Sequence, residues 1–315
     1  MTYIQAIVIA VFQGVTELFP VSSLGHSVLL PAWLGGSWQT LVTQSAQATS
    51  ESSFYLAYIV ALHVATALAL LWFFRADWVR IIRGLFRSAL RMVKLRRWDV
   101  QDADERLAWM LVIATIPVGL TGIALEHTFR TLFAKPLAAA VFLFVNGLVL
   151  LGGEILRRRV KARGASVGET DRSLDPLSAR AAEESDANIA RLGYKDALIV
   201  GVFQIAALFA GISRSGVTIV GGLWRGLDHE DAARFGFLLA TPIIFAAGVL
   251  KLPSLAGPAG AHIHGQVIVG FLVCGVTAYL SVRFLVRYFE TRTLTPFAIY
   301  CLVVGAASAL RFGIG

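Results

Sequence analysis

The sequence is poor in charged residues for a chain of its length. Only 15% of its 315 residues are Asp, Glu, Lys or Arg, whereas soluble domains contain about 25%. Apolar side chains make up 57% of the chain, and its mean hydropathy is +0.70. This composition excludes an ordinary soluble domain and predicts an all-α integral membrane protein.

The chain has only two cysteines, Cys274 and Cys301, and both lie inside apolar runs. A disulfide framework, a cysteine zinc site and a redox pair are therefore excluded. The net charge of +8 would suit nucleic acid, but the basic residues flank apolar runs, as they do in membrane proteins. We expect membrane lipids as partners and no nucleic acid. No basic region or cleavage site precedes Gln13, so a cleaved signal peptide is not expected.

Six uncharged stretches approach the length of about 20 residues that a helix needs to cross a bilayer. They are 54–74, 107–125, 136–153, 235–250, 265–282 and 293–310. Two further apolar stretches, 3–33 and 196–224, are interrupted midway by polar and helix-breaking residues. Non-helical backbone at membrane depth must be buried in protein or line a cavity. We therefore predict six transmembrane helices plus two re-entrant helical hairpins.

The distribution of basic residues gives the predicted orientation. Segments 75–106 and 157–195 are rich in Lys and Arg and should be cytoplasmic, whereas 36–53 and 253–264 contain neither and should lie outside. The first hairpin then enters from outside and the second from the cytoplasm, which is an inverted-topology repeat. The predicted division is 1–156 for the first repeat, 157–194 for a cytoplasmic connector and 195–315 for the second repeat.

Internal sequence similarity supports the repeat. A shift of 191 positions aligns Val11, Phe12, Gln13, Ser22 and Gly25 with Val202, Phe203, Gln204, Ser213 and Gly216. In transporters with such repeats the binding site lies at the interrupted helices.

Within the first cytoplasmic segment, residues 78–97 place basic residues at helical spacing, which predicts a surface helix that contacts anionic lipid headgroups. These residues are Arg80, Arg83, Arg87, Arg91 and Lys94.

The first interruption collects groups that can do chemistry. Glu17 follows Gln13 by one helical turn, and Pro20 should end that helix near Phe19. Ser22 or Ser23 then caps the returning helix, and His26 follows one turn later. An ionisable side chain at membrane depth costs at least about 2.5 kcal/mol and is a functional candidate by default.

The second interruption resembles an anion site. Gly211 and Gly216 allow a tight turn, while Ser213 and Ser215 can cap the next helix and leave its first amides free for an anion. Arg214 adds a planar fork that suits phosphate oxygens. Opposite an acid, a hydroxyl and an imidazole, this arrangement indicates phosphoryl chemistry.

We predict Glu17, Ser23, His26 and Arg214 as catalytic residues. Ser23 is either the nucleophile or a hydroxyl beside the attack path, Glu17 its base or the orienter of a water, and His26 a proton donor or acceptor. Spacing leaves open which group attacks. The predicted substrate-binding residues, most of which could instead be helix caps, are Gln13, Ser22, Gly25, Gly211, Ser213, Ser215 and Thr218. No metal-ligand set is predicted. His63 has no acidic neighbour at helical spacing and is expected to be a hydrogen-bonded core histidine.

At these two interruptions the chain resembles the bacterial undecaprenyl-diphosphate phosphatases. The family's first motif, (E/Q)xxxE followed by PVSSxGH, matches Gln13, Glu17 and the run from Pro20 to His26, and its motif PGxSRSxxT matches Gly211 to Thr218. The resemblance implies a membrane enzyme that hydrolyses a C55 polyprenyl diphosphate to the monophosphate and phosphate. Such enzymes recycle the lipid carrier of peptidoglycan synthesis and confer bacitracin resistance. The resemblance also implies a multi-pass inner-membrane location, with the site facing outward, and leaves a homodimer open.

Two positions depart from the family pattern. Gln13 replaces the more frequent Glu, which removes a second acidic ligand, so no cofactor is certain and a divalent cation, Mg²⁺ or Ca²⁺, stays open. Ala210 replaces the usual Pro. The rival interpretation is a polyprenyl-phosphate transporter or flippase, because fold does not fix function. A second class of lipid phosphatases needs His six residues after Arg214, where this chain has Val220.

Overall fold

The structure is a computed structural model that describes residues 1–47, 54–124, 135–162, 175–251 and 263–314. Within these ranges every regular element is a helix, as predicted. Six helices in the described part are long and apolar enough to cross a membrane, and each overlaps one predicted span. They are α4 (Phe54–Phe73), α6 (Ala103–Ala124), α8 (Pro136–Ala162), α12 (His229–Lys251), α14 (His264–Thr291) and α15 (Thr295–Ile314). Residues 253–262 of the predicted outer loop at 253–264 lie outside the described residues.

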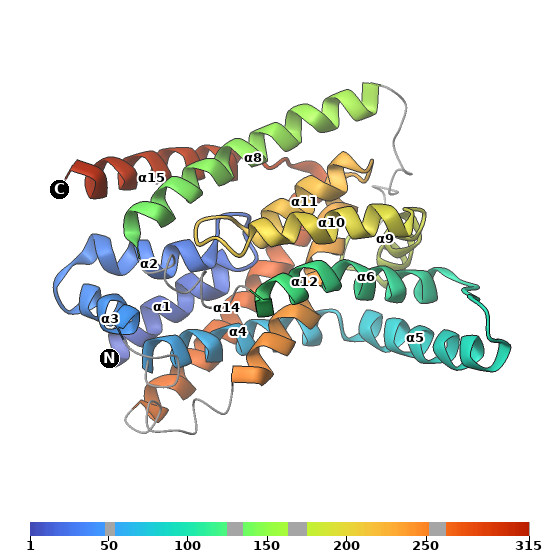
Figure 1. Cartoon of the computed structure of the whole chain (residues 1–315), viewed down its shortest axis with the longest axis horizontal. Coiled ribbons are helices and arrows are strands. Elements are labelled where there is room, and N and C mark those ends of the chain that lie inside the picture. The colour runs from blue at the N-terminus through green and yellow to red at the C-terminus, as the bar shows by residue number, and fades with distance from the viewer. Residues whose placement is uncertain (48–53, 125–134, 163–174, 252–262, 315) are drawn as a thin grey trace.

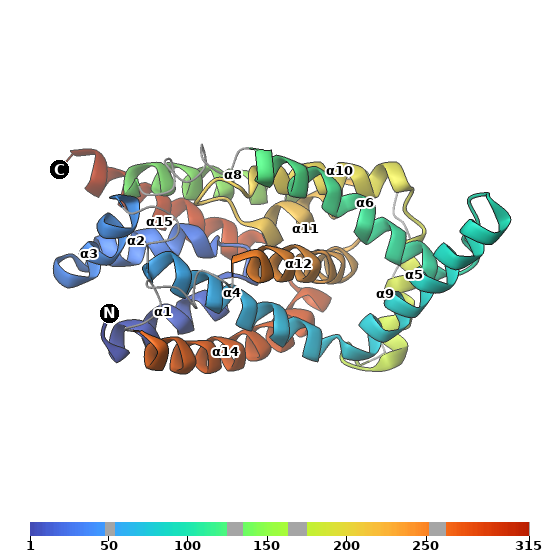
Figure 2. The same cartoon turned by 60° about the horizontal axis from the view of Figure 1, so that its bottom comes forward.

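Both interrupted stretches form a helix, a break and a second helix. The first consists of α1 (Tyr3–Thr16) and α2 (Ser23–Leu34), and the second of α10 (Tyr194–Ala206) and α11 (Arg214–Trp224). The two pairs extend from opposite ends of the molecule, and their breaks lie together near its middle (Figures 1 and 2). Their depth in a bilayer and the division of the chain into 1–156, 157–194 and 195–315 stay predictions.

The two breaks begin their second helices in the same way. The hydroxyl of Ser22 accepts a hydrogen bond from the amide of Gly25 at 3.2 Å, and Ser213 accepts one from Gly216 at 3.1 Å. These are the serines and glycines that the shift of 191 positions aligns. The predicted end of the first helix near Phe19 is wrong by about one turn, because α1 already ends at Thr16.

Three further helices lie beside the bundle: α3 (Gly36–Gln47), α5 (Arg75–Leu95) and α9 (Ala179–Ala190). Both chain termini and α3 lie at one end, and α5 and α9 lie at the other (Figure 1). The end with α5 and α9 therefore carries the two basic segments. This arrangement agrees with the orientation expected from the charges.

Three of the five basic residues of α5 pair with acids, and contact of the helix with anionic lipid headgroups stays a prediction. Arg87 is bonded to Glu105 at 2.7 Å, and Arg91 also contacts Glu105. Arg80 lies 2.6 Å from Asp186 of the connector helix α9. The sequence spacing identified the helix, but acids from later segments, which local spacing does not reveal, pair with three of its five predicted bases.

Candidate active site

Asn146 forms hydrogen bonds with both breaks. This asparagine of α8 is fully buried, donates from Nδ2 to the carbonyl oxygen of Pro20 at 3.0 Å and accepts from the amide of Ser213 at 2.9 Å. The Ser22 hydroxyl also accepts from the amide of Gly211 at 3.1 Å. Each break therefore supplies hydrogen-bonding groups that satisfy the non-helical backbone of the other.

Two unusual backbone conformations give the breaks their shape. Gly211 has φ +111°, and a Cβ atom there would lie 2.5 Å from the carbonyl oxygen of Ala139. Ser22 has φ +70°, a conformation that non-glycine residues rarely adopt and that is concentrated at functional sites. This turn places Ser23 in the first position of α2 with its hydroxyl toward Glu17.

The Glu17 carboxylate lies at the centre of the site. Its Oε1 atom accepts from Nη2 of Arg214 at 2.9 Å, so the two breaks are joined by an ion pair. Its Oε2 atom accepts from the Ser23 hydroxyl and from Nε2 of Gln13 at 3.0 Å, and lies 3.3 Å from Nε2 of His63. Glu17 is buried, so these partners compensate for taking its charge out of water.

His63 corrects an expectation from the sequence. Its Nδ1 atom lies 2.8 Å from the Ile59 carbonyl oxygen, which matches the expected core histidine, but its Nε2 atom contacts the catalytic candidate Glu17. The absence of an acidic neighbour along α4 was misleading, because the acid comes from α1. Asn146 was also missed, although a lone amide inside the apolar run 136–153 was a signal for it.

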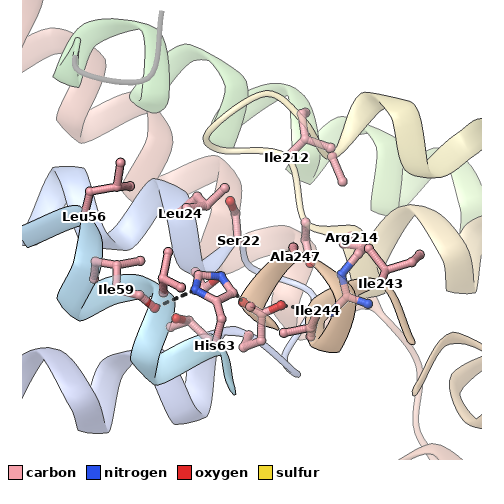
Figure 3. Close-up of a pocket in the computed structure, with 17 residues that line it drawn as sticks. Ser22, Leu24, Leu56, Ile59, His63, Ile212, Arg214, Ile243, Ile244 and Ala247 are labelled. Carbon is pink, nitrogen blue, oxygen red and sulfur yellow. Dashed lines mark hydrogen bonds and ion pairs between the residues drawn. The ribbon is translucent and has the colours of Figure 1, made fainter. Parts of the chain in front are cut away.

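A cavity of about 290 Å³ adjoins these residues. Figure 3 shows Ser22, His63 and Arg214 in this pocket, with Leu24, Leu56, Ile59 and Ile243 among its apolar lining. Arg214 has a buried Nη1 atom with no hydrogen-bond partner among the described residues. The cavity thus combines a guanidinium that has one unpaired donor and a hydroxyl paired with a carboxylate, beside apolar walls from α4 and α12.

The predicted site residues divide into two groups. Glu17, Ser22, Ser23, Ser213 and Arg214 line the cavity. The others lie behind it: Gln13 bonds to Glu17, Gly25 and Gly211 donate amides to the Ser22 hydroxyl, Ser215 donates to the Phe19 carbonyl oxygen, and Thr218 to that of Arg214. These contacts support the breaks, and direct substrate contact by the second group stays a prediction.

His26 is turned away from the carboxylate. Its Nδ1 atom lies 2.7 Å from the Ser22 carbonyl oxygen and its Nε2 atom 2.8 Å from the hydroxyl of Tyr300 on α15. It is not among the cavity-lining residues. Its predicted part in proton transfer stays a prediction, and the contacts seen fix the orientation of α2 relative to α15.

The donor set is a poor fit for a cation held by the protein alone. Among the described residues no group of three or more His, Cys, Asp or Glu side chains could hold a metal ion. Mg²⁺ and Ca²⁺ take six or more oxygen ligands. Glu17 supplies the only acidic oxygens of the described cavity lining, and both already accept hydrogen bonds.

Comparison with known proteins extends the resemblance seen at the two interruptions to the rest of the chain. Residues 6–307 match the family described as bacitracin resistance protein BacA. Undecaprenyl-diphosphatase 2 of Frankia alni is 56% identical over 345 aligned positions, which cover 100% of this chain and 99% of the relative. Undecaprenyl-diphosphatase of Mycolicibacterium paratuberculosis is 56% identical over 98% of this chain and 96% of its own length. The chain therefore belongs to the bacitracin resistance protein BacA family.

Proposed function

We propose that this chain hydrolyses undecaprenyl diphosphate to undecaprenyl phosphate and inorganic phosphate, and so recycles the lipid carrier of peptidoglycan synthesis. The family and its relatives support the reaction. The observation that carries the proposal is the Glu17 carboxylate, which accepts hydrogen bonds from the Ser23 hydroxyl and the Arg214 guanidinium at one cavity. The six apolar helices and the family make the chain a multi-pass protein of the bacterial inner membrane.

The diphosphate binds at the polar end of the cavity. Arg214 supplies the free Nη1 donor and a permanent charge for the phosphate oxygens. The prenyl chain follows the apolar wall formed by Leu56 and Ile59 of α4 and Ile243 and Ala247 of α12. Since α4 begins near the end of the molecule that carries α3, the lipid enters from the face that the charge distribution predicts to be outside (Figure 1).

Ser23 is the nucleophile in the proposed reaction. Its hydroxyl proton passes to Glu17 while Oγ bonds to the terminal phosphorus and the bridging P–O bond breaks, which releases undecaprenyl phosphate. Water then attacks the phosphoserine, and Glu17 returns the proton to the departing Oγ as phosphate leaves. Arg214 stabilises the charge on the transferring phosphoryl group, where most of the catalysis of such reactions arises.

We further propose that any Mg²⁺ or Ca²⁺ used in the reaction arrives on the diphosphate, because the described lining supplies only one carboxylate. The homodimer left open by the sequence stays a prediction.

Phosphate release from undecaprenyl diphosphate by purified protein in detergent tests the proposed function, with a titration of Mg²⁺ and Ca²⁺. The wild-type chain should release phosphate, and Ser23→Ala should lose activity by at least about a hundredfold. Thr66→Val is the control, because Thr66 lies one turn beyond His63 on α4 and, within the described part of the chain, its hydroxyl bonds only to Leu62 and Cys274. Absence of release by the wild type under every cation condition would favour the transport alternative. Near-normal turnover by Ser23→Ala would assign the attack to water.

A further inference from the structure

A second basic site lies on α14, away from the catalytic cavity. Arg283 and Arg287 are one helical turn apart and exposed, and Arg292 follows directly after the helix. None of the three forms an ion pair with an acid among the described residues. With Phe284, Tyr288 and Thr291 they line an open hollow of about 450 Å³. None of these residues lines the cavity at Glu17.

The arginines lie along α14 at the depth expected of lipid headgroups. An exposed apolar stripe, Ile268, Leu272, Val276, Leu280 and Phe284, follows the helix at intervals of one turn, with exposed fractions of 61, 62, 63, 58 and 52%. Arg283 is the first charged residue after the uncharged run 265–282. A stripe of this length on a transmembrane helix faces acyl chains, so the arginines at its end lie at the level of the phosphates.

Contacts place this end of α14 on the connector side. The amide of Leu294, just after Arg292, donates to Oε1 of Glu154 at 2.7 Å, and His229 lies 2.6 Å from the same atom. Glu154 belongs to the last part of α8, which leads into the basic connector. The hollow therefore faces the leaflet that the charge distribution predicts to be cytoplasmic, opposite to the entrance of the catalytic cavity.

We propose that this hollow binds the headgroup of an anionic phospholipid of the cytoplasmic leaflet. Guanidinium forks suit phosphate oxygens, and their charge selects an anionic over a zwitterionic headgroup. Leu280 and Phe284 continue the apolar stripe and receive the acyl chains. An acidic protein is a poorer occupant, because Leu280 and Phe284, which form the apolar half of the hollow, would have to leave the hydrocarbon to contact it.

The site is connected to the catalytic break through an aromatic stack. The rings of Phe284 and Phe19 lie 5.8 Å apart with an interplanar angle of 2°. Phe19 belongs to the first break, and its carbonyl oxygen accepts the hydroxyl of Ser215 from the second break at 3.2 Å. A lipid bound beside Phe284 therefore restrains a residue that lies two positions after Glu17.

The test measures lipid binding by native mass spectrometry of the full-length protein in detergent. The probes are phosphatidylglycerol, phosphatidylcholine with the same acyl chains, and undecaprenyl phosphate. The variants are Arg283→Gln/Arg287→Gln and, as a control of equal charge loss, Arg180→Gln/Arg191→Gln at the two ends of the connector helix α9, where both side chains are exposed.

The wild type should prefer phosphatidylglycerol to phosphatidylcholine, and the α14 double variant should lose about tenfold in phosphatidylglycerol affinity while the α9 variant changes by less than about twofold. Phosphate release in neutral detergent, which both variants should keep, shows that they are folded. Equal losses in both variants would mean diffuse attraction and overturn the site. Stronger retention of undecaprenyl phosphate than of phosphatidylglycerol at this site would overturn the assignment to phospholipid.

Discussion

The Nε2 atom of His63 lies 3.3 Å from Oε2 of Glu17, and Nδ1 of the same ring lies 2.8 Å from the carbonyl oxygen of Ile59. A carbonyl oxygen only accepts, so Nδ1 carries a proton. The contact with Oε2 favours a proton on Nε2 as well, which would make His63 and Glu17 an ion pair. A protonated His63 would add to the positive charge that Arg214 offers a phosphate.

Replacing His63 should weaken both the orientation of Glu17 and the attraction for the diphosphate. We expect His63→Ala to lower kcat/KM by about ten- to hundredfold, and His63→Gln to recover part of kcat because an amide still donates to the carboxylate. Steady-state phosphate release with separate kcat and KM values measures both effects. An unchanged kcat/KM in His63→Ala would show that His63 is a hydrogen-bonded core histidine with no part in catalysis.

Arg214 should not be replaceable by another cation. The guanidinium contacts Glu17 through Nη2 and keeps Nη1 for the substrate. Lys keeps the charge but has no such fork. We expect Arg214→Ala to lower kcat by about a hundred- to a thousandfold and Arg214→Lys to recover less than about a tenth of the loss. Arg225→Lys at the C-terminal end of the same helix is the matched control. Full activity of Arg214→Lys would show that charge alone is sufficient.

Asn146→Leu should loosen the contact between the breaks. The substitution leaves the Ser213 amide without its partner, at a cost of about 1–3 kcal/mol, and leaves the Pro20 carbonyl with only the weaker Cys301 thiol donor. Thermal unfolding in detergent and phosphate release should both decline. Thr115→Val, which removes a hydrogen bond within a single helix, should leave both nearly unchanged. A stable but inactive Asn146→Leu chain would assign Asn146 to the chemistry instead of the scaffold.

Gly211→Ala should destabilise the second break. Its φ of +111° disfavours any side chain, and the new methyl group would lie 2.7 Å from the amide nitrogen of Leu143. We expect the free energy of unfolding to fall by about 1–3 kcal/mol. Gly152→Ala in α8, where an added methyl group meets no atom within 4 Å, should be neutral or slightly stabilising. An equal melting temperature for the two variants would contradict this account of Gly211.

The orientation of the chain can be read by labelling single cysteines with an impermeant reagent in spheroplasts. Thr40→Cys near the α3 end should react, whereas Arg97→Cys after α5 should react only after permeabilisation, because both positions are exposed on opposite ends. The native Cys274 and Cys301 are buried and should stay silent. Reaction of Arg97→Cys in sealed spheroplasts would reverse the predicted orientation.

The sequence predicts those features of this fold that depend on residues close to one another in the chain, such as uncharged runs and helix caps. Uncharged runs of sufficient length become helices because lipid leaves the backbone no other partner, and all six predicted spans have a matching helix. Caps depend on residues three positions apart, which is why Ser22 and Ser213 could be identified. The two motifs also identified Glu17 and Arg214, which the structure joins directly.

Contacts between distant helices could not be predicted from spacing. Nothing along α4 indicates that His63 meets an acid from α1, and nothing along α8 specifies that Asn146 contacts both breaks. His26 shows the same difficulty at short range. It lies one turn after Ser22, so its ring reaches the Ser22 carbonyl and Tyr300, whereas the adjacent Ser23 points toward Glu17.

The hydrogen bonds that cross between the breaks make the two parts of the chain mutually dependent. The carboxylate and the hydroxyl come from residues before the connector, and the guanidinium comes from residues after it. A gene cut within 163–174 would encode two fragments, neither of which can assemble the catalytic centre by itself. Activity would return only when both fragments are made in the same cell, so complementation between the pieces reports on their association.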